Sequence, residues 1–157
     1  MGIIITLIIV SLASGWFWLQ SRNKSVLLVQ ETTGSVLVVD QQSFDIEIAE
    51  TPAQLQLGLS GRDEIGSDGL LFIFSGPNQS GFWMKDMKFA LDMVWIANGE
   101  IVEITRDVPF PTSPEENTDA ALPRYYPSQP IEMVLEVTAG FAQQHDWQVG
   151  DSVSLIR

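Results

Sequence analysis

The sequence predicts a mainly-β protein: an antiparallel β-sandwich or barrel with one or two short helices, preceded by an N-terminal transmembrane helix. Short apolar or alternating segments of strand length recur along the chain, and turn signals such as Asn98-Gly99 separate them. The uncharged segment near the amino terminus is almost as long as a membrane-spanning helix. Apolar residues make up 45% of the 157 residues, enough for the core of one domain. We therefore expect an anchor and its flank at residues 1–24 and a single β-rich domain at residues 25–157.

The amino-terminal segment Gly2–Leu19 carries no charged residue. As a helix it would span about 27 Å at ~1.5 Å per residue, slightly less than a ~30 Å hydrocarbon core. Trp16 and Trp18 lie where an interfacial aromatic belt is expected, and Arg22 and Lys24 follow at headgroup depth. These features favour a single-pass anchor that contacts the membrane through residues 2–19.

Two alternatives to this arrangement stay open at the sequence level. Ala13 and Gly15 are small residues of the kind that precede a cleavage site, so the segment could be a signal peptide and the domain secreted. The absence of Lys or Arg before the apolar core argues against cleavage. Arg22 and Lys24 would place the domain in the cytoplasm by the positive-inside rule, although two charges give only a weak bias.

Strand patterns run through the body of the chain. Phe44, Ile46 and Ile48 alternate with Asp45 and Glu47, which is the period of a half-buried strand. The other predicted strands are 26–30, 36–40, 70–74, 82–84, 91–96, 100–105, 131–137 and 152–156. Many short strands separated by turns are typical of an antiparallel sandwich or barrel.

Helix and loop signals complete the pattern. Thr51 offers an N-cap hydroxyl, Pro52 fits the first helical position, and Gln54 completes a capping box, so a short helix should run to about Leu59. Residues 139–145 can form a second short helix. Residues 107–130 are polar and hold six of the eight prolines; a loop of this length inside a compact domain is often functional.

Charge and rare residues exclude several function classes. The chain has 20 acidic and eight basic residues, a net charge of −12, so we expect no nucleic-acid partner. It has no cysteine, which excludes disulfides and thiolate chemistry. His145 is the only histidine, too few for a typical zinc site or a serine–histidine triad. The carboxylates at 115–119 lack the EF-hand spacing. We expect no metal and no cofactor.

Three segments together resemble the bacterial and archaeal domain of unknown function 192 family. They are TPAQLQLGLSGRDEIGSDGLLFIF (51–74), FWMKDMKFALDMVWI (82–96) and YPSQPIEMVLEVTAGFAQQHDWQVGDSV (126–153). The resemblance extends over about 44–155 and implies a compact β-rich fold of jelly-roll type. It also implies a location outside the cytoplasmic membrane, and it implies no activity. Asp86-Met87 and Ala90 depart from the family's usual Asn-Thr and proline.

The segment 82–96 also holds the principal candidate site, because it places charged residues among Trp and Met residues. We predict a shallow ligand-binding site in which Trp83 is a stacking platform and Lys85 and Asp92 are polar contacts, with Arg106 and Tyr125 nearby. The structural alternative is that Lys85 and Asp92, or Asp86 and Lys88, are paired or hydrogen-bond turn amides, and so only fix the connection between strands.

The function that these features favour is a membrane-anchored, extracytoplasmic module that binds a glycan, a peptide or an envelope protein without catalysis. No complete catalytic constellation is evident. The first alternative is a carboxylate-based hydrolase of cell-envelope polymers, which requires Asp92 in a cleft within ~10 Å of a second carboxylate such as Glu103 or Glu132. The second alternative is a structural or assembly protein, in which the segment 82–96 is core.

Overall fold

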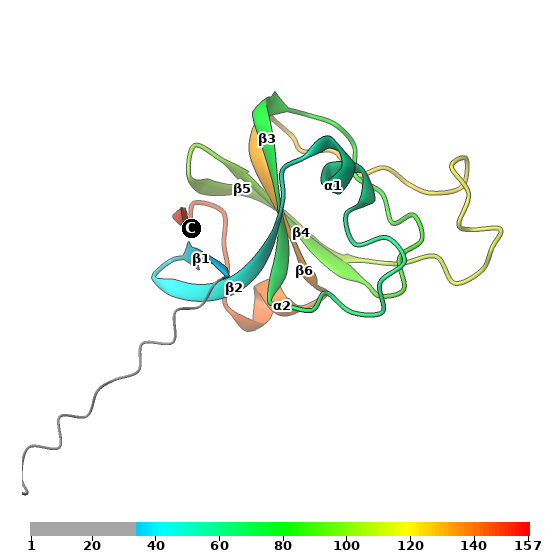
Figure 1. Ribbon diagram of the computed structural model, residues 1–157, viewed down its shortest axis with the longest axis horizontal. Helices are drawn as coiled ribbons and strands as arrows, with labels where there is room; N and C mark the ends of the chain where they lie inside the picture. Colours follow the sequence, from blue (N-terminus) through cyan, green and yellow to red (C-terminus); the bar gives the residue numbers. More distant parts are fainter. Residues whose placement is uncertain (1–33) are drawn as a thin grey trace, which may run out of the picture. The chain divides into compact units, whose positions relative to one another are not determined.

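A computed structural model describes residues 34–157, and its main element is one seven-stranded β-sheet with two short helices (Figure 1). The strands are β1 (Ser35–Val39), β2 (Gln42–Ala49), β3 (Gly69–Asn78), β4 (Leu91–Ala97), β5 (Glu100–Val108), β6 (Ile131–Thr138) and β7 (Val153–Ile156). The helices are α1 (Pro52–Leu57) and α2 (Phe141–Gln144). The spatial order of the strands is β5-β4-β6-β3-β2-β1-β7.

The sheet is mixed, so the prediction of an antiparallel sandwich or barrel of jelly-roll type was wrong. A jelly roll packs two antiparallel sheets, whereas here β2 and β3 run parallel within a single sheet. Parallel neighbours need a crossover connection, and the segment 50–68, which contains α1, provides it. The alternation within a strand shows its two faces but not the direction of its neighbour, and this is why the sequence pattern missed the parallel pair.

The two edges of the sheet approach each other at one end. The Ile101 amide donates to the Asp151 carbonyl at 2.9 Å, the Gly150 amide donates to Ile101 at 2.8 Å, and the Val153 amide donates to Gly99 at 2.7 Å. These bonds connect the start of β5 to the start of β7. The sheet therefore curves into a half-barrel, and the fold is mainly β.

The transmembrane part of the predicted fold class also needs correction. Within residues 34–157 no helix is long and apolar enough to cross a membrane. The segment Gly2–Leu19, on which that prediction was made, lies outside the described residues, as does the strand predicted at 26–30.

Each face of the sheet has its own hydrophobic core. The α1-side core includes Phe72, Met93 and Trp95, and partly buried Leu55 of α1 packs against it. The α2-side core includes Val94 and Trp147, together with Ala142 of α2. Every residue of β4 is buried, because alternate side chains enter the two cores. A strand covered on both faces explains why 91–96 is so apolar.

Local predictions from the sequence are confirmed where short-range contacts decide the structure. The Gln54 amide donates to the Thr51 hydroxyl at 3.3 Å, and the Thr51 amide donates to the Gln54 side-chain oxygen at 3.1 Å, which completes the capping box. Asn98 and Gly99 have φ of 53° and 75°, as a type I′ turn requires. The strand predicted at 82–84 is instead an isolated bridge between Phe82 and Tyr125.

Candidate functional site

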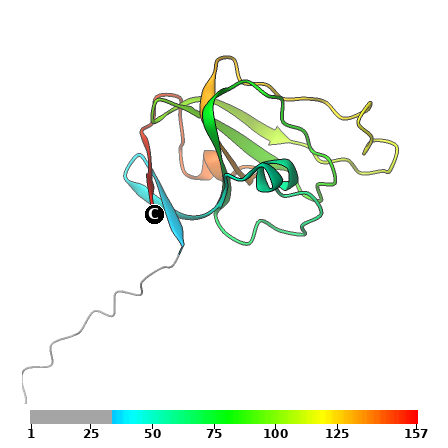
Figure 2. The ribbon, with the colours of Figure 1, turned by 45° about the horizontal axis from the view of Figure 1, so that its top comes forward.

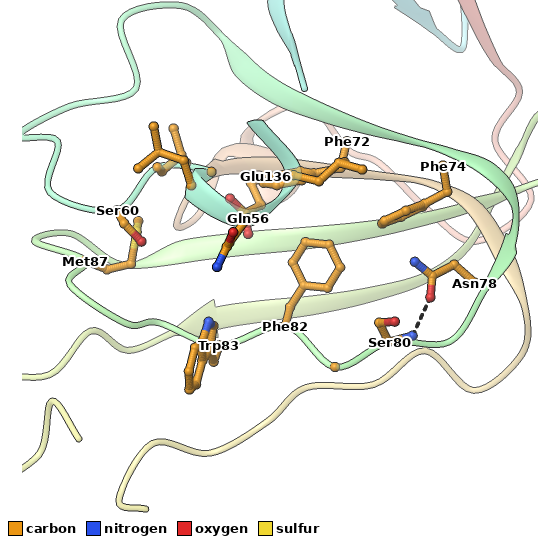
Figure 3. A pocket seen from close by; sticks show the side chains of 15 residues that line it. Gln56, Ser60, Phe72, Phe74, Asn78, Ser80, Phe82, Trp83, Met87 and Glu136 are labelled. Atoms are coloured by element: carbon orange, nitrogen blue, oxygen red, sulfur yellow. Dashed lines mark hydrogen bonds between the residues drawn. The ribbon is translucent and has the colours of Figure 1, made fainter. Parts of the chain in front are cut away.

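A pocket of about 290 Å³ opens between α1, the second half of β3 and the segment 80–87 (Figure 3). Ten of its fifteen lining residues are apolar, aromatic or glycine, and the other five contribute polar side chains. The apolar lining residues are Leu55, Leu57, Gly58, Leu59, Phe72, Phe74, Gly81, Phe82, Trp83 and Met87, and the polar ones are Gln56, Ser60, Asn78, Ser80 and Glu136. A concave apolar site with a few polar groups is the usual form of a small-molecule site.

The chain passes close to Phe72 at the end of α1, and a glycine permits this approach. Gly58 has φ of 50°, and a Cβ atom there would lie 3.0 Å from Cζ of Phe72. Only a residue without a side chain combines this backbone conformation with such close contact at low cost. Gly58 therefore lets the turn after α1 form one wall of the pocket in close contact with the Phe72 ring.

Phe82 is the central aromatic residue of the pocket (Figure 3). Its ring packs edge-to-face against Phe72, Phe74 and Trp95, with centroid distances of 5.1, 6.3 and 5.5 Å. The backbone of Phe82 is fixed by two hydrogen bonds to Tyr125, each of 2.8 Å. Edge-to-face packing and backbone pairing hold this aromatic wall in place before any ligand arrives.

Glu136 of β6 is the polar residue that distinguishes the pocket. Its side chain is only 5% exposed, and its strand neighbours on the same face are Leu70 and Met93. Burial raises the pKa of the Glu136 carboxyl to about 8, and no neighbouring charge or hydrogen bond in the described part of the chain contributes to the shift. An unpaired buried carboxyl at the wall of an apolar pocket is a candidate functional group.

A second pocket of about 560 Å³ adjoins the first and shares Gln56, Leu57, Ser60 and Trp83 with it. Lys85 and Asp119 line this second pocket and form an ion pair. The Lys85 ammonium lies 5.3 Å from the centroid of the Trp83 ring, and the guanidinium carbon of Arg124 lies 3.7 Å from the same centroid. Cations of the chain itself therefore already occupy positions over this indole ring.

The turn after Trp83 is held by side chains from two other segments. Asp86 has φ of 57°, its amide donates to the Asn117 side-chain oxygen at 2.9 Å, and its carboxylate accepts from the Asn117 side-chain amide at 2.7 Å. Ser60 donates to the Lys85 carbonyl at 2.8 Å. The long loop around residues 109–125, which extends away from the sheet in Figure 2, thus fixes the rim of the pockets.

Neither charge pair of the structural alternative is formed, whereas its other form, a carboxylate that accepts hydrogen bonds from backbone amides, holds for Asp92. Lys85 pairs with Asp119 instead of Asp92, and Lys88 pairs with Asp63 at 2.7 Å instead of Asp86. Both pairs are partly or largely exposed, so they hold surface segments together and do not lie in the core.

The five residues predicted to form the site are divided between different parts of the molecule. Trp83 and Lys85 lie together at the two pockets, and Tyr125 pairs with Phe82 and packs against the α1-side core. Asp92 and Arg106 lie elsewhere. The binding role of Trp83, Lys85 and Tyr125 stays a prediction.

Asp92 is fully buried on the α2 side of the sheet. Its carboxylate accepts hydrogen bonds from the amides of Asp107, Gly140 and Ala142 at 2.9, 3.1 and 3.1 Å. It therefore fixes the start of α2 and the end of β5. Arg106 is also structural here, because its guanidinium donates to the Trp147 carbonyl at 2.9 Å.

Sequence reasoning considered Glu136 among the candidate carboxylates but did not predict that it lines a pocket. Alternation in 131–137 puts Glu132 and Glu136 on the face opposite Met133 and Leu135, which suggests a solvated face. The structure covers that face with α1 and the segment 80–87. One signal was present in the sequence, because the apolar residue Val134 lies between the two glutamates on the same face. In the structure Val134 is completely buried.

The fold and its pocket define a class of small β half-barrels with an aromatic pocket on one face of the sheet. Within this class, the chain belongs to the DUF192 family, described as "Uncharacterized ACR", whose family model matches residues 35–155. No curated protein has significant sequence similarity to it.

Two solved structures are similar to the chain. One is a protein of Sinorhizobium meliloti 1021 described as a proposed transcription regulator; it is 26% identical with a TM-score of 0.64, over 76% of this chain and 90% of that one. The other is a protein of unknown function from Novosphingobium aromaticivorans DSM 12444. It is 23% identical with a TM-score of 0.63, over 77% of this chain and 83% of that one, which shows the fold alone.

Proposed function

We propose that this protein is a non-catalytic binding module whose pocket between α1, β3 and the segment 80–87 holds a small ligand with an apolar body. The observation that carries this proposal is the combination of a rigid aromatic wall around Phe82 with one buried, unpaired carboxyl, Glu136. Apolar walls supply affinity, and a single polar group in such a pocket fixes orientation.

The positions of the other carboxylates favour binding over hydrolysis. The hydrolase alternative required Asp92 in a cleft, yet Asp92 is sealed and accepts three backbone hydrogen bonds. Glu103 accepts from the Ser128 amide at 2.9 Å, and Glu132 accepts from the Asn98 amide at 2.9 Å. Glycoside cleavage normally needs two carboxyls that face each other across the substrate, whereas Glu136 is the only carboxyl that lines its pocket in the described residues.

The location and the partner class belong to the same proposal. The sequence resemblance suggests an extracytoplasmic domain, and the long aromatic-tipped loop suggests a glycan, a peptide or an envelope protein as the partner. A role in transcription, as described for the Sinorhizobium protein, is disfavoured for this chain by its net charge of −12, because phosphate binding depends on clusters of Lys and Arg.

The test is a fragment screen of the full chain by saturation-transfer NMR, with small aromatic and aliphatic compounds that are neutral, cationic or anionic. Gln56→Trp places a large side chain at the wall that both pockets share and should remove the binding of any hit. Gln144→Trp makes the same change at an exposed glutamine of α2, outside both pockets, and should leave the hits unchanged. If no fragment binds, or if both variants behave alike, the pocket is not a ligand site.

A further inference from the structure

We propose that the pocket binds an organic ammonium ion, whose charged group lies against the Glu136 carboxylate and whose apolar substituent lies among Phe72, Phe74 and Phe82. This inference rests on the proposed function and names its ligand class. It combines the chemistry of the buried carboxyl, the aromatic wall and the charge of the whole chain.

The first step concerns the missing counter-charge of Glu136. Glu136 is 5% exposed and its carboxyl is mostly neutral at pH 7, because the ionised form would be costly here unless a cation paired with it. No Lys, Arg or His of the described residues lines the pocket. The lysines of the adjacent turn, Lys85 and Lys88, are engaged by Asp119 and Asp63. A ligand is therefore the group that can supply the positive charge.

The second step concerns the aromatic wall. The rings around Phe82 give an apolar surface that accepts alkyl or aryl substituents, and the negative π potential of ring faces attracts organic cations. Trp83, at the outer end of the pocket, already has two cationic side chains near its ring. The same chemistry is available inside the pocket, where the described residues provide no cation.

The third step concerns the sign of the charge. The chain carries −12 overall, so its long-range field draws cations toward the surface and repels anions. An anionic ligand would be repelled by this field, and also by Glu136 at any pH where that carboxyl is ionised. Gln56, Ser60 and Ser80 add neutral oxygens that can accept hydrogen bonds from a primary ammonium group.

The protonation of Glu136 gives the inference a distinctive signature. With a pKa of about 8, the free carboxyl is about 90% protonated at pH 7. An ammonium ion binds the ionised form, so binding at pH 7 should release close to one proton. The residues that face Glu136 from β3, β4, α1 and the segment 80–87 include Leu70, Met93, Gln56 and Met87, none of which titrates. The proton released should therefore come from Glu136.

The experiment is isothermal titration calorimetry of the full chain with three probes of similar size: phenethylammonium, 2-phenylethanol and 3-phenylpropanoate. At pH 8.5 we expect phenethylammonium to bind about tenfold or more tightly than either other probe. Glu136→Gln should reduce that affinity by about tenfold or more, because it removes the charge and keeps the shape. Glu100→Gln, at an exposed carboxylate of β5, is the charge-matched control and should keep wild-type affinity.

Two results would overturn the inference and leave the proposed function standing: tighter binding of the alcohol or the carboxylate that Gln56→Trp abolishes, or ammonium binding that Glu136→Gln does not change. Absence of binding by all three probes also overturns it, while the wider fragment screen decides the proposed function separately. If Glu136→Gln does not fold, proton release by the wild type decides. Titrations at pH 7 in buffers of different ionisation enthalpy should show about one proton released, and a value near zero contradicts the inference.

Discussion

Two buried carboxyls on adjacent strands, Asp92 of β4 and Glu136 of β6, show how different the role of one chemical group can be on the two faces of a sheet. Asp92 enters the α2-side core and accepts three backbone hydrogen bonds. Glu136 enters the α1 side, where its pocket provides no counter-charge within the described residues. A buried carboxylate that accepts several backbone hydrogen bonds holds structure together, whereas a carboxyl that lines a pocket without a counter-charge is available to a ligand.

The largest expected effect comes from removing the satisfied carboxyl. Asp92→Ala leaves the amides of Asp107, Gly140 and Ala142 without their acceptor, and each unsatisfied buried donor costs about 1–3 kcal/mol. We expect the free energy of unfolding to fall by about 4 kcal/mol, measured by urea denaturation. Glu100→Ala, at an exposed carboxylate, should change it by less than about 0.5 kcal/mol. A loss below about 1 kcal/mol for Asp92→Ala would show that those amides find other partners.

The second expected effect is the contribution of Glu136 to the dependence of stability on pH. Its pKa is raised from 4.5 to about 8 in the folded state, so between these values the folded protein binds more protons than the unfolded chain. The stability that this group contributes is therefore fully present below pH 4.5 and is lost as the pH rises through about 8. We expect the free energy of unfolding to fall by about 4 kcal/mol more in the wild type than in Glu136→Gln between pH 5 and pH 8.5.

This pH experiment has an internal check. Thermal or urea unfolding of the two proteins in parallel removes the contribution of all other titrating groups, because they are common to both. Parallel pH profiles for the wild type and Glu136→Gln would show that the carboxyl is hydrated or paired in solution.

The third prediction is a change in the free energy of unfolding with the opposite sign to the change expected for Asp92→Ala. Glu136→Leu replaces an unpaired buried carboxyl by an apolar side chain of similar size, so the free energy of unfolding at pH 7 should rise by about 1–2 kcal/mol. The same variant should lose phenethylammonium binding, which separates a gain in stability from a loss of function. A decrease in stability would mean that Glu136 contributes to the packing of the sheet.

The smallest expected effect concerns an exposed pair near the same pocket. Asp119→Asn removes the partner of Lys85, and because both side chains are at least one-third exposed we expect a loss of no more than about 0.5 kcal/mol. Urea unfolding at low and high salt measures it, and the difference should vanish at high salt. A loss comparable to that of Asp92→Ala would show that the Lys85–Asp119 pair fixes the long loop cooperatively.

The predictable parts of this protein are those set by near neighbours in the chain. The capping box of Thr51 and Gln54 and the turn at Asn98-Gly99 were predicted correctly, because the groups that form them lie within a few residues. The jelly-roll prediction failed at the parallel pairing of β2 and β3, which depends on a crossover and not on local pattern. The candidate site was predicted in part, because Trp83 and Lys85 line a pocket whereas Asp92 is buried in the core.

Within the described residues, the sequence by itself determined most of the strand segments and the tight turn at Asn98-Gly99, and it also determined the acidic charge and the membership of the family. It did not determine which carboxyl is open to a ligand. Alternation assigns each residue of a strand to one of two faces, but only the tertiary structure decides what covers each face. Here α2 brings amides to Asp92, whereas α1 and the segment 80–87 bring aromatic rings to Glu136. The free energy of a buried charge depends on those distant partners, and so the tertiary structure alone distinguished the structural carboxyl from the candidate binding group.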